Sequence, residues 1–165
     1  MAISSVAKNF RDGQLAIEDG AGSPLTVTVQ YEDGNFSASG FTEGLKDIAK
    51  YEDRGVFYSA RHTKRVYPSG SFAAHLTDIS DGTEKTLFDL ANKTGAWAAA
   101  TSTLGANAEV MTYKITWTVE GSDHGDVGGD HTLVLDDCRL SCDISEGDPS
   151  TITISFECMG DVDAT

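Results

Sequence analysis

The chain has 165 residues, of which 39% are hydrophobic and 23% charged, a composition typical of a globular domain whose core needs no disulfide or metal. Its 26 acidic and 12 basic residues give a formal net charge of −14, which excludes a protein that coats nucleic acid or an anionic membrane, because both depend on lysine and arginine. No apolar run reaches the ~20 residues of a membrane-spanning helix and the N-terminus lacks a secretory signal pattern, so we expect folding in a cytoplasm.

Apolar and polar residues alternate with period two along much of the chain, which predicts antiparallel strands with one dry and one wet face. In chain order these segments are residues 14–18, 25–31, 36–41, 71–77, 110–120, 133–144 and 151–159. Asp-Gly pairs precede residue 14 and follow residue 31, and the second pair predicts a hairpin that joins 25–31 to 36–41. Residues 146–150 predict another hairpin between the last two strands.

One helix is predicted between residues 81 and 95, with a weaker helical turn at 45–49 and a loop at 96–107. Its signals are an N-cap at Asp81 with Glu84 three residues later, an apolar stripe of Leu87, Phe88, Leu90 and Ala91, Lys93 in the last turn, and Gly95 as a left-handed cap. No repeat or linker divides the chain. The sequence therefore predicts one domain over residues 1–165, a mainly β antiparallel sandwich or partly closed barrel with one flanking α-helix.

The three cysteines fit a core role. If residues 146–150 form a loop, Ser145 lies opposite Thr151 and Cys138 lies opposite Cys158, on the face that the apolar residues share. A Cys138–Cys158 disulfide is geometrically conceivable, but we do not expect it in a reducing compartment.

Catalytic motifs are not recognisable. The glycines at 20–22 lack the lysine and hydroxyl of a phosphate-binding loop, and no Gly-x-Ser-x-Gly occurs. Residues 122–131 concentrate Asp and His, but Val134 stands where an EF-hand needs glutamate, so a solvated loop is favoured over a divalent-ion site. We expect a protein that is not an enzyme and has no cofactor, catalytic residue or metal site.

Opposite charges are concentrated in different parts of the chain. The basic residues Lys46, Lys50, Arg54, Arg61, Lys64 and Arg65 lie within twenty positions, whereas residues 120–165 carry twelve acidic residues and only Arg139 to offset them. This asymmetry favours subunits that meet head to tail. The inter-subunit candidates are Arg54, Arg61, Lys64 and Arg65 on the basic side, with Asp136 and Asp137 on the acidic side. A solvated basic loop, or one that touches nucleic acid, is the alternative interpretation.

Five segments, read in order, resemble the major tail tube proteins of long, non-contractile-tailed (siphovirus-type) bacteriophages. They are NFRDGQLAI at 9–17, LTVTVQYEDGNFS at 25–37, YEDRGV at 51–56, GSFAA at 70–74 and TLFDL at 86–90, within a similarity that runs from about residue 6 to residue 160. The resemblance implies a β-sandwich with a flanking helix, close to the type VI secretion tube protein. It further implies rings of six copies whose inner sheets join into a barrel, stacked into a virion tail tube through which DNA is ejected. The implied partners are other copies and tail proteins such as the tape measure, terminator and distal tail protein, with no membrane and no specific DNA binding.

A water-filled bore requires a wet strand face, and residues 110–120 provide one. The lumen-facing candidates are Thr112, Lys114, Thr116, Thr118 and Glu120, with residues 36–41 and 25–31 next in order. Net negative walls would repel phosphate and let DNA pass. Residues 54–69 and the N-terminal arm, residues 1–10, are candidate contacts between rings. The alternatives are a tail terminator, a capsid decoration protein, or a carbohydrate-binding β-sandwich, which would need exposed aromatic residues, whereas we expect Trp97 in a loop and Trp117 in the core.

Overall fold

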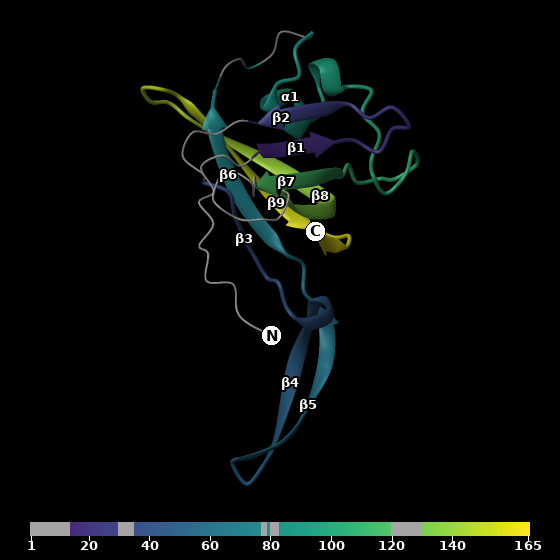
Figure 1. The fold of residues 1–165 in the computed structure, drawn as a ribbon, viewed down its shortest axis with the longest axis vertical. Coiled ribbons are helices and arrows are strands. Elements are labelled where there is room, and N and C mark those ends of the chain that lie inside the picture. Colours follow the sequence, from purple (N-terminus) through teal and green to yellow (C-terminus); the bar gives the residue numbers. More distant parts are fainter. Residues whose placement is uncertain (1–13, 30–34, 77–78, 80–82, 120–129) are drawn as a thin grey trace.

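A computed structural model of the chain describes residues 14–29, 35–76, 79, 83–119 and 130–165. Most strands belong to one antiparallel sheet in the order β2-β1-β7-β8-β9-β6-β3, with β10 beside β8, while β4 and β5 pair separately (Figure 1). The strands are β1 (Gln14–Glu18), β2 (Thr26–Val29), β3 (Ser37–Ser39), β4 (Lys46–Asp53), β5 (Val56–Arg65), β6 (Ser69–His75), β7 (Tyr113–Val119), β8 (His131–Ser145), β9 (Thr151–Cys158) and β10 (Val162–Ala164). The helices are α1 (Leu87–Asn92) and the 3₁₀ turns Glu43–Leu45 and Gly95–Trp97. The predicted mainly β antiparallel fold with one α-helix is confirmed, and the sheet does not close into a barrel.

Strand β8 belongs to both halves of this sheet. Its first part pairs with β7 and β10, and its second part pairs with β9. At the transition the register with β7 shifts, and Asp137 adopts a φ of 53°, which marks a β-bulge. Gly160 lies against this bulge, because a Cβ there would stand 2.7 Å from the Asp136 carbonyl group. The sheet therefore changes direction at residues 136–137.

The core is enclosed between the two halves of the sheet. Leu15, Ile17, Ile115 and Leu135 come from one half, and Phe72, Ile152, Ile154 and Phe156 come from the other. The Phe36 ring stacks on Trp117 at 5.1 Å and on Phe156 at 5.7 Å, so it joins β7 to β9 across the interior. The dry face predicted for residues 110–120 is confirmed at Tyr113, Ile115 and Val119, which are buried.

Helix α1 covers one end of this core and begins later than expected. Its N-cap is Thr86, whose hydroxyl accepts a hydrogen bond of 3.1 Å from the Asp89 amide, while Asp81 lies outside the described residues. Its left-handed C-cap is Lys93, with a φ of 55°, instead of Gly95. The Tyr113 hydroxyl donates to the Leu90 carbonyl at 2.8 Å, and burial followed by the charge of Asp19 raises the pKa of Tyr113 to about 12.

The predicted pairing of the last two strands is confirmed residue for residue. Cys138 lies opposite Cys158 and Ser145 lies opposite Thr151. All three cysteines are free, and the hydrogen bond with Cys158, together with burial, raises the pKa of the Cys138 thiol. This keeps Cys138 protonated, as suits a residue that packs in the core.

The hairpin predicted between residues 25–31 and 36–41 is wrong. Strand β2 pairs with β1, and β3 pairs with β6 at the far edge of the sheet. The Asp-Gly signal is local, whereas the partner of each strand is decided by tertiary packing, here by Phe36 between Trp117 and Phe156.

Candidate assembly surfaces

Strands β4 and β5 form a two-stranded arm that projects from the rest of the chain (Figure 1). Their pairing runs from Lys46 with Arg65 to Asp53 with Val56, and Arg54 and Gly55 turn the chain with φ values of 52° and 78°. Two consecutive positive φ values are typical of a tight hairpin turn. The expected loop at 54–69 is therefore mostly strand β5, and the expected helical turn at 45–49 lies mostly in strand β4. The sequence signal that could have revealed the arm is the Arg54-Gly55 pair, followed directly by Val-Phe-Tyr.

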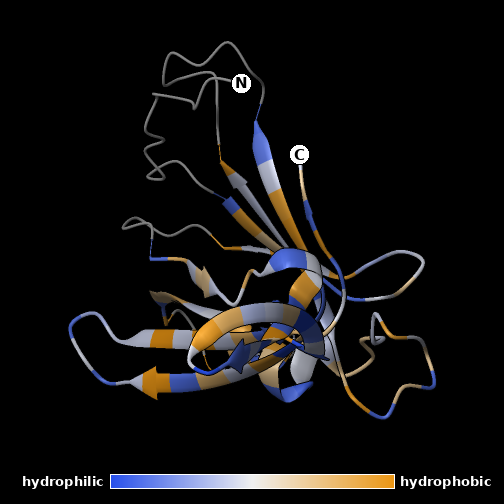
Figure 2. Cartoon of the chain, turned by 90° about the horizontal axis from the view of Figure 1, so that it is seen from below, coloured by the Kyte–Doolittle hydropathy of each residue, from blue (hydrophilic) through white to orange (hydrophobic). Residues whose placement is uncertain are grey.

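The end of the arm exposes a cluster of apolar side chains. Val56, Phe57 and Tyr58 are 69%, 62% and 79% exposed, and Tyr51 and Ile48 lie further along the arm, also exposed. Figure 2, which looks at the molecule from below, shows hydrophobic segments among the hydrophilic ones of the arm. Tyr58 is the extra residue of a bulge, because Phe57 pairs with Glu52 and Ser59 pairs with Tyr51. Exposed apolar clusters mark interaction surfaces, and an isolated two-stranded hairpin is only marginally stable in water.

Three of the basic candidates lie along this arm. Arg54 is at the turn, Arg61 is in the middle of β5, and Lys64 is near its base. All three are exposed, and within the described part of the chain none makes an ion pair or a side-chain hydrogen bond. The arm therefore presents three cations that form no ion pair among the described residues, together with the exposed carboxylates of Asp47, Glu52 and Asp53.

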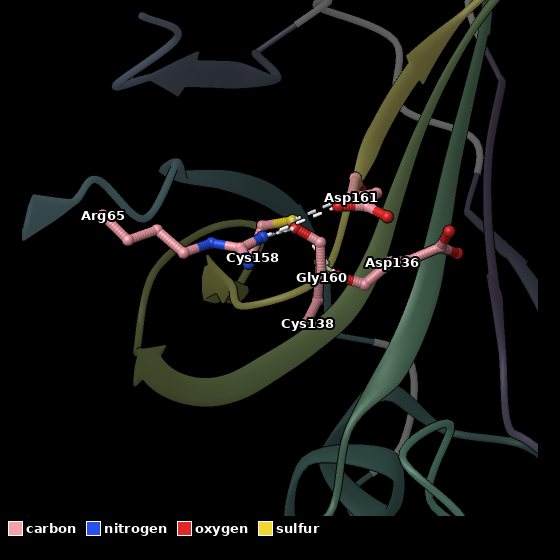
Figure 3. Close-up of polar contacts among 6 residues, drawn as sticks. All are labelled: Arg65, Asp136, Cys138, Cys158, Gly160 and Asp161. Carbon is pink, nitrogen blue, oxygen red and sulfur yellow. Dashed lines mark hydrogen bonds and ion pairs between the residues drawn. The ribbon is translucent and has the colours of Figure 1, made fainter. Parts of the chain in front are cut away.

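Arg65, the fourth basic candidate, is engaged inside its own chain. Its Nη2 atom donates to the Gly160 carbonyl at 2.7 Å and lies 3.7 Å from Oδ1 of Asp161 (Figure 3). Its guanidinium group also lies 5.8 Å from the centre of the Tyr67 ring. These contacts connect the base of the arm to the segment that follows β9, so Arg65 positions the arm.

The two acidic candidates meet at the β8 bulge, beside an acidic hollow of about 430 Å³ lined by Arg65, Thr103, Asp136, Asp137, Met159, Gly160 and Asp161. Asp137 accepts a hydrogen bond of 2.6 Å from the Thr103 hydroxyl, so it is partly structural. Burial, followed by the charge of Asp137, raises the pKa of Asp136, while Lys114 opposes the shift. This crowding of carboxylates favours a cationic partner.

Only part of the predicted lumen face lies on a wet surface. Thr112 precedes β7 and is fully buried, where its hydroxyl lies 2.8 Å from those of Ser102 and Thr103, so its assignment to the wet face is wrong. Thr116 and Thr118 are half-buried, and Glu120 lies outside the described residues. Lys114 makes an ion pair of 2.9 Å with Glu18 on the same face.

The structure reveals a second wet face that the sequence pattern did not predict. Outward positions of β3, β6, β9 and the second part of β8 carry mostly hydroxyl groups: Ser37, Ser39, Ser69, Ser71, Ser141, Ser145, Thr151, Thr153 and Ser155. We call these residues the hydroxyl face. Among the described residues, β3 has no strand partner on its outer side, and the second part of β8 has none opposite β9. The alternation of residues 151–157 predicts one strand of this face. The other strands can be assigned to it only from the observed strand register.

These surfaces carry few clusters of side chains that could bind a metal ion or catalyse a reaction. Among the described residues, no three His, Cys, Asp or Glu side chains are placed to hold a metal ion, and no helix has the length and apolar character to cross a membrane. Trp97 is fully buried, edge-on to Tyr113, instead of lying in an open loop.

The fold is shared with chains of contractile injection particles. No family model and no curated protein matches the sequence. A chain in the sheath-tube complex of an extracellular contractile injection system, PVC, aligns with a TM-score of 0.57 and 10% identity over 98% of this chain and 93% of that one. A chain in the tube terminating cap of the anti-feeding prophage aligns with a TM-score of 0.54 and 11% identity over 100% and 94%. A chain in the PVC sheath/tube terminator aligns with a TM-score of 0.54 and 13% identity over 99% of both.

Proposed function

We propose that this chain is a structural subunit of a phage-tail-like tube, which joins copies of itself around a hollow bore. Six copies would form each ring, and stacked rings would form a virion tail tube through which DNA is ejected, of the non-contractile type that the sequence resembles. Other tail proteins would be its partners, and it would have no enzymatic role. The likeness to chains of tube-containing particles supports the tube fold.

The observation that carries this proposal is a sheet half with a hydroxyl-rich outer face and two edges that have no strand partner among the described residues. Unpaired edges invite further pairing and are usually short, charged or covered in proteins that stay monomeric. At the opposite edge of the sheet, Lys85 donates to the carbonyl group of Thr26 on β2 at 3.1 Å, so that edge is partly covered. We infer that β3 of one copy pairs with the second part of β8 of the next, so that the sheet continues around a ring.

This arrangement directs the hydroxyl face toward the bore. Its side chains are mostly serine and threonine. The charged residues of β8 and β9 at its outward positions are Asp143, Glu157 and Arg139, and Arg139 lies opposite Glu157, so these strands give the face a small net negative charge and little attraction for DNA phosphates. The rival bore surface is the β7 face with Lys114, Thr116 and Thr118. Labelling separates the two, because a polymer-linked maleimide too large for the bore should react with a cysteine on the outer surface of an assembled tube and spare one inside.

We expect Ser155→Cys to be protected in tubes and Thr116→Cys to react, with both reacting in dissociated subunits. The native cysteines provide the baseline in the unsubstituted protein. The opposite pattern would assign the bore to β7.

The assembly itself is tested by electron microscopy of the purified protein over a range of concentrations. A tube subunit should give stacked rings or rods with a central channel. A tail terminator is the second candidate, because the terminator and cap chains align with TM-scores of 0.54, close to the 0.57 of the sheath-tube chain, and it should give single rings. A capsid decoration protein or a carbohydrate-binding module should give neither.

The arm would make the contacts between rings, together with residues 1–10, which lie outside the described residues. Arg54, Arg61 and Lys64 have no partner within the described part of the chain, and Asp136 and Asp137 belong to an acidic surface. A contact led by these charges should weaken with salt, since exposed charges are screened beyond about 10 Å at 0.1 M. Association that is unchanged between low and high salt would contradict the charge-led contact.

A further inference from the structure

A second hollow is lined by the same loop that contributes Thr103 to the acidic one. It has a volume of about 370 Å³, and its lining includes Ala98, Ala99, Ala106, Ala108 and Met111. Ser102 and Gly105 also line it, while Thr103, between them, lines the acidic hollow. We call this second site the alanine hollow.

The alanine hollow suits a tyrosine side chain. Small methyl groups leave room for a ring, and the neighbouring backbone and hydroxyl groups offer partners for a phenolic hydroxyl, the combination that favours tyrosine at interfaces. Lys93 and Glu109 also line the hollow, so it carries one charge of each sign. The arm carries the complementary set next to its apolar end: Glu52 and Asp53 before the turn, and Arg54 in it.

Two features point to Tyr58 as the side chain that enters. It is the most exposed of the arm's apolar residues, and it is the extra residue of a bulge, a feature that commonly re-aims a side chain. The arm ends at one extremity of the molecule's long axis, and α1 with the loop that follows it lies toward the other (Figure 1). The arm therefore reaches this hollow only on a second copy.

We propose that the arm of one copy lies across the loop of residues 98–111 of another, with Tyr58 in the alanine hollow and Arg61 and Lys64 over the acidic hollow. Three to six residues of strand separate Tyr58 from these cations, roughly 10–20 Å at about 3.3 Å per residue, so one arm can reach both hollows, to which neighbouring residues of one loop contribute. Two different patches meet in this contact, so it is heterologous and propagates from copy to copy. The inference rests on the proposed function and adds the receiving surface of the arm.

Cross-linking tests the contact directly in the full chain. Tyr58→Cys combined with Ala106→Cys should give a ladder of disulfide-linked multimers under copper–phenanthroline oxidation. Tyr58→Cys combined with Ser155→Cys should not, because Ser155 lies on the hydroxyl face. The unsubstituted protein, with its three native cysteines, sets the background.

Filling the hollow provides the second measurement. Ala106→Trp should raise the concentration needed for assembly roughly tenfold or more, since loss of an aromatic anchor costs over about 1.4 kcal/mol. Glu146→Trp, in the exposed loop between β8 and β9 and outside the lining of both hollows, should leave it unchanged. If the unsubstituted protein assembles but Ala106→Trp assembles equally well and the Tyr58–Ala106 pair gives no ladder, the inference is overturned while the tube function stands. If the unsubstituted protein stays monomeric at every concentration, both are overturned.

Discussion

Removal of the arm should separate folding from assembly. The variant replaces residues 46–65 by Asn-Gly, and the cut ends already adjoin, because the Val66 amide donates to the Leu45 carbonyl at 2.8 Å. In the described structure, the polar side-chain contacts from the deleted segment to the rest of the chain are those of Arg65. They are one hydrogen bond to Gly160, one ion pair with Asp161, whose side chain is 88% exposed, and a cation–ring contact with Tyr67.

The expected cost in stability follows from those contacts. A hydrogen bond from a charged group contributes about 1.5–3 kcal/mol and an exposed ion pair about 0–1 kcal/mol, so at this exposed site we expect a loss of about 1–2 kcal/mol in the free energy of unfolding. For a chain of this size that lowers Tm by about 2–8 °C. Differential scanning calorimetry measures this change, and Arg65→Ala alone should account for most of it.

Assembly should be lost completely in the same variant. Sedimentation velocity should show a monomer at concentrations where the full chain forms large particles. A variant that unfolds at room temperature would refute the view that the arm is dispensable for folding. A folded variant that still forms tubes would refute its role between subunits.

Three further substitutions test the interior and the bulge. Gly70→Ala should cost about 1–3 kcal/mol in urea unfolding, because its Cβ would overlap the Ser37 carbonyl oxygen; an unchanged midpoint would contradict the pairing of β3 with β6. Tyr113→Phe should cost about 1 kcal/mol through the lost bond to the Leu90 carbonyl, and the absorbance titration of Tyr113 in the unsubstituted protein should lie near pH 12, above that of exposed tyrosines. The pKa of Asp136 is raised in the folded chain, so protonation favours folding and the stability gained that way is lost as pH rises through the folded pKa. Asp136→Asn should therefore increase the free energy of unfolding at pH 7, and this gain should disappear below about pH 4. A gain that persists below about pH 4 would show that removal of the Asp136 charge is not its cause.

The sequence predicted those parts of the fold that depend on local pattern. Alternation identified the strands around Ile115 and Ile154, and the loop length at 146–150 was enough to place Cys138 opposite Cys158. The apolar stripe predicts helix α1, but the N-cap is Thr86 and not Asp81, because the Thr86 hydroxyl offers an acceptor oxygen closer to the first helical turn.

The rest could not be read from local pattern because it depends on contacts between distant residues. The Asp-Gly turn after residue 31 gives no information about β3, whose partner is set by Phe36 and β6. The arm was missed because its exposed strands lack the dry face that alternation detects, so Phe57 and Tyr58 read as part of a loop. The hydroxyl face joins Ser37, Ser71 and Ser155, which only the register brings together.

Cryo-electron microscopy of the purified protein at assembling concentration tests the central claim most directly. We predict particles with a central channel, in which sheets run continuously from subunit to subunit and Ser155 faces the channel. A protein that remains a single compact copy at every concentration, or that associates without enclosing a channel, would contradict the account.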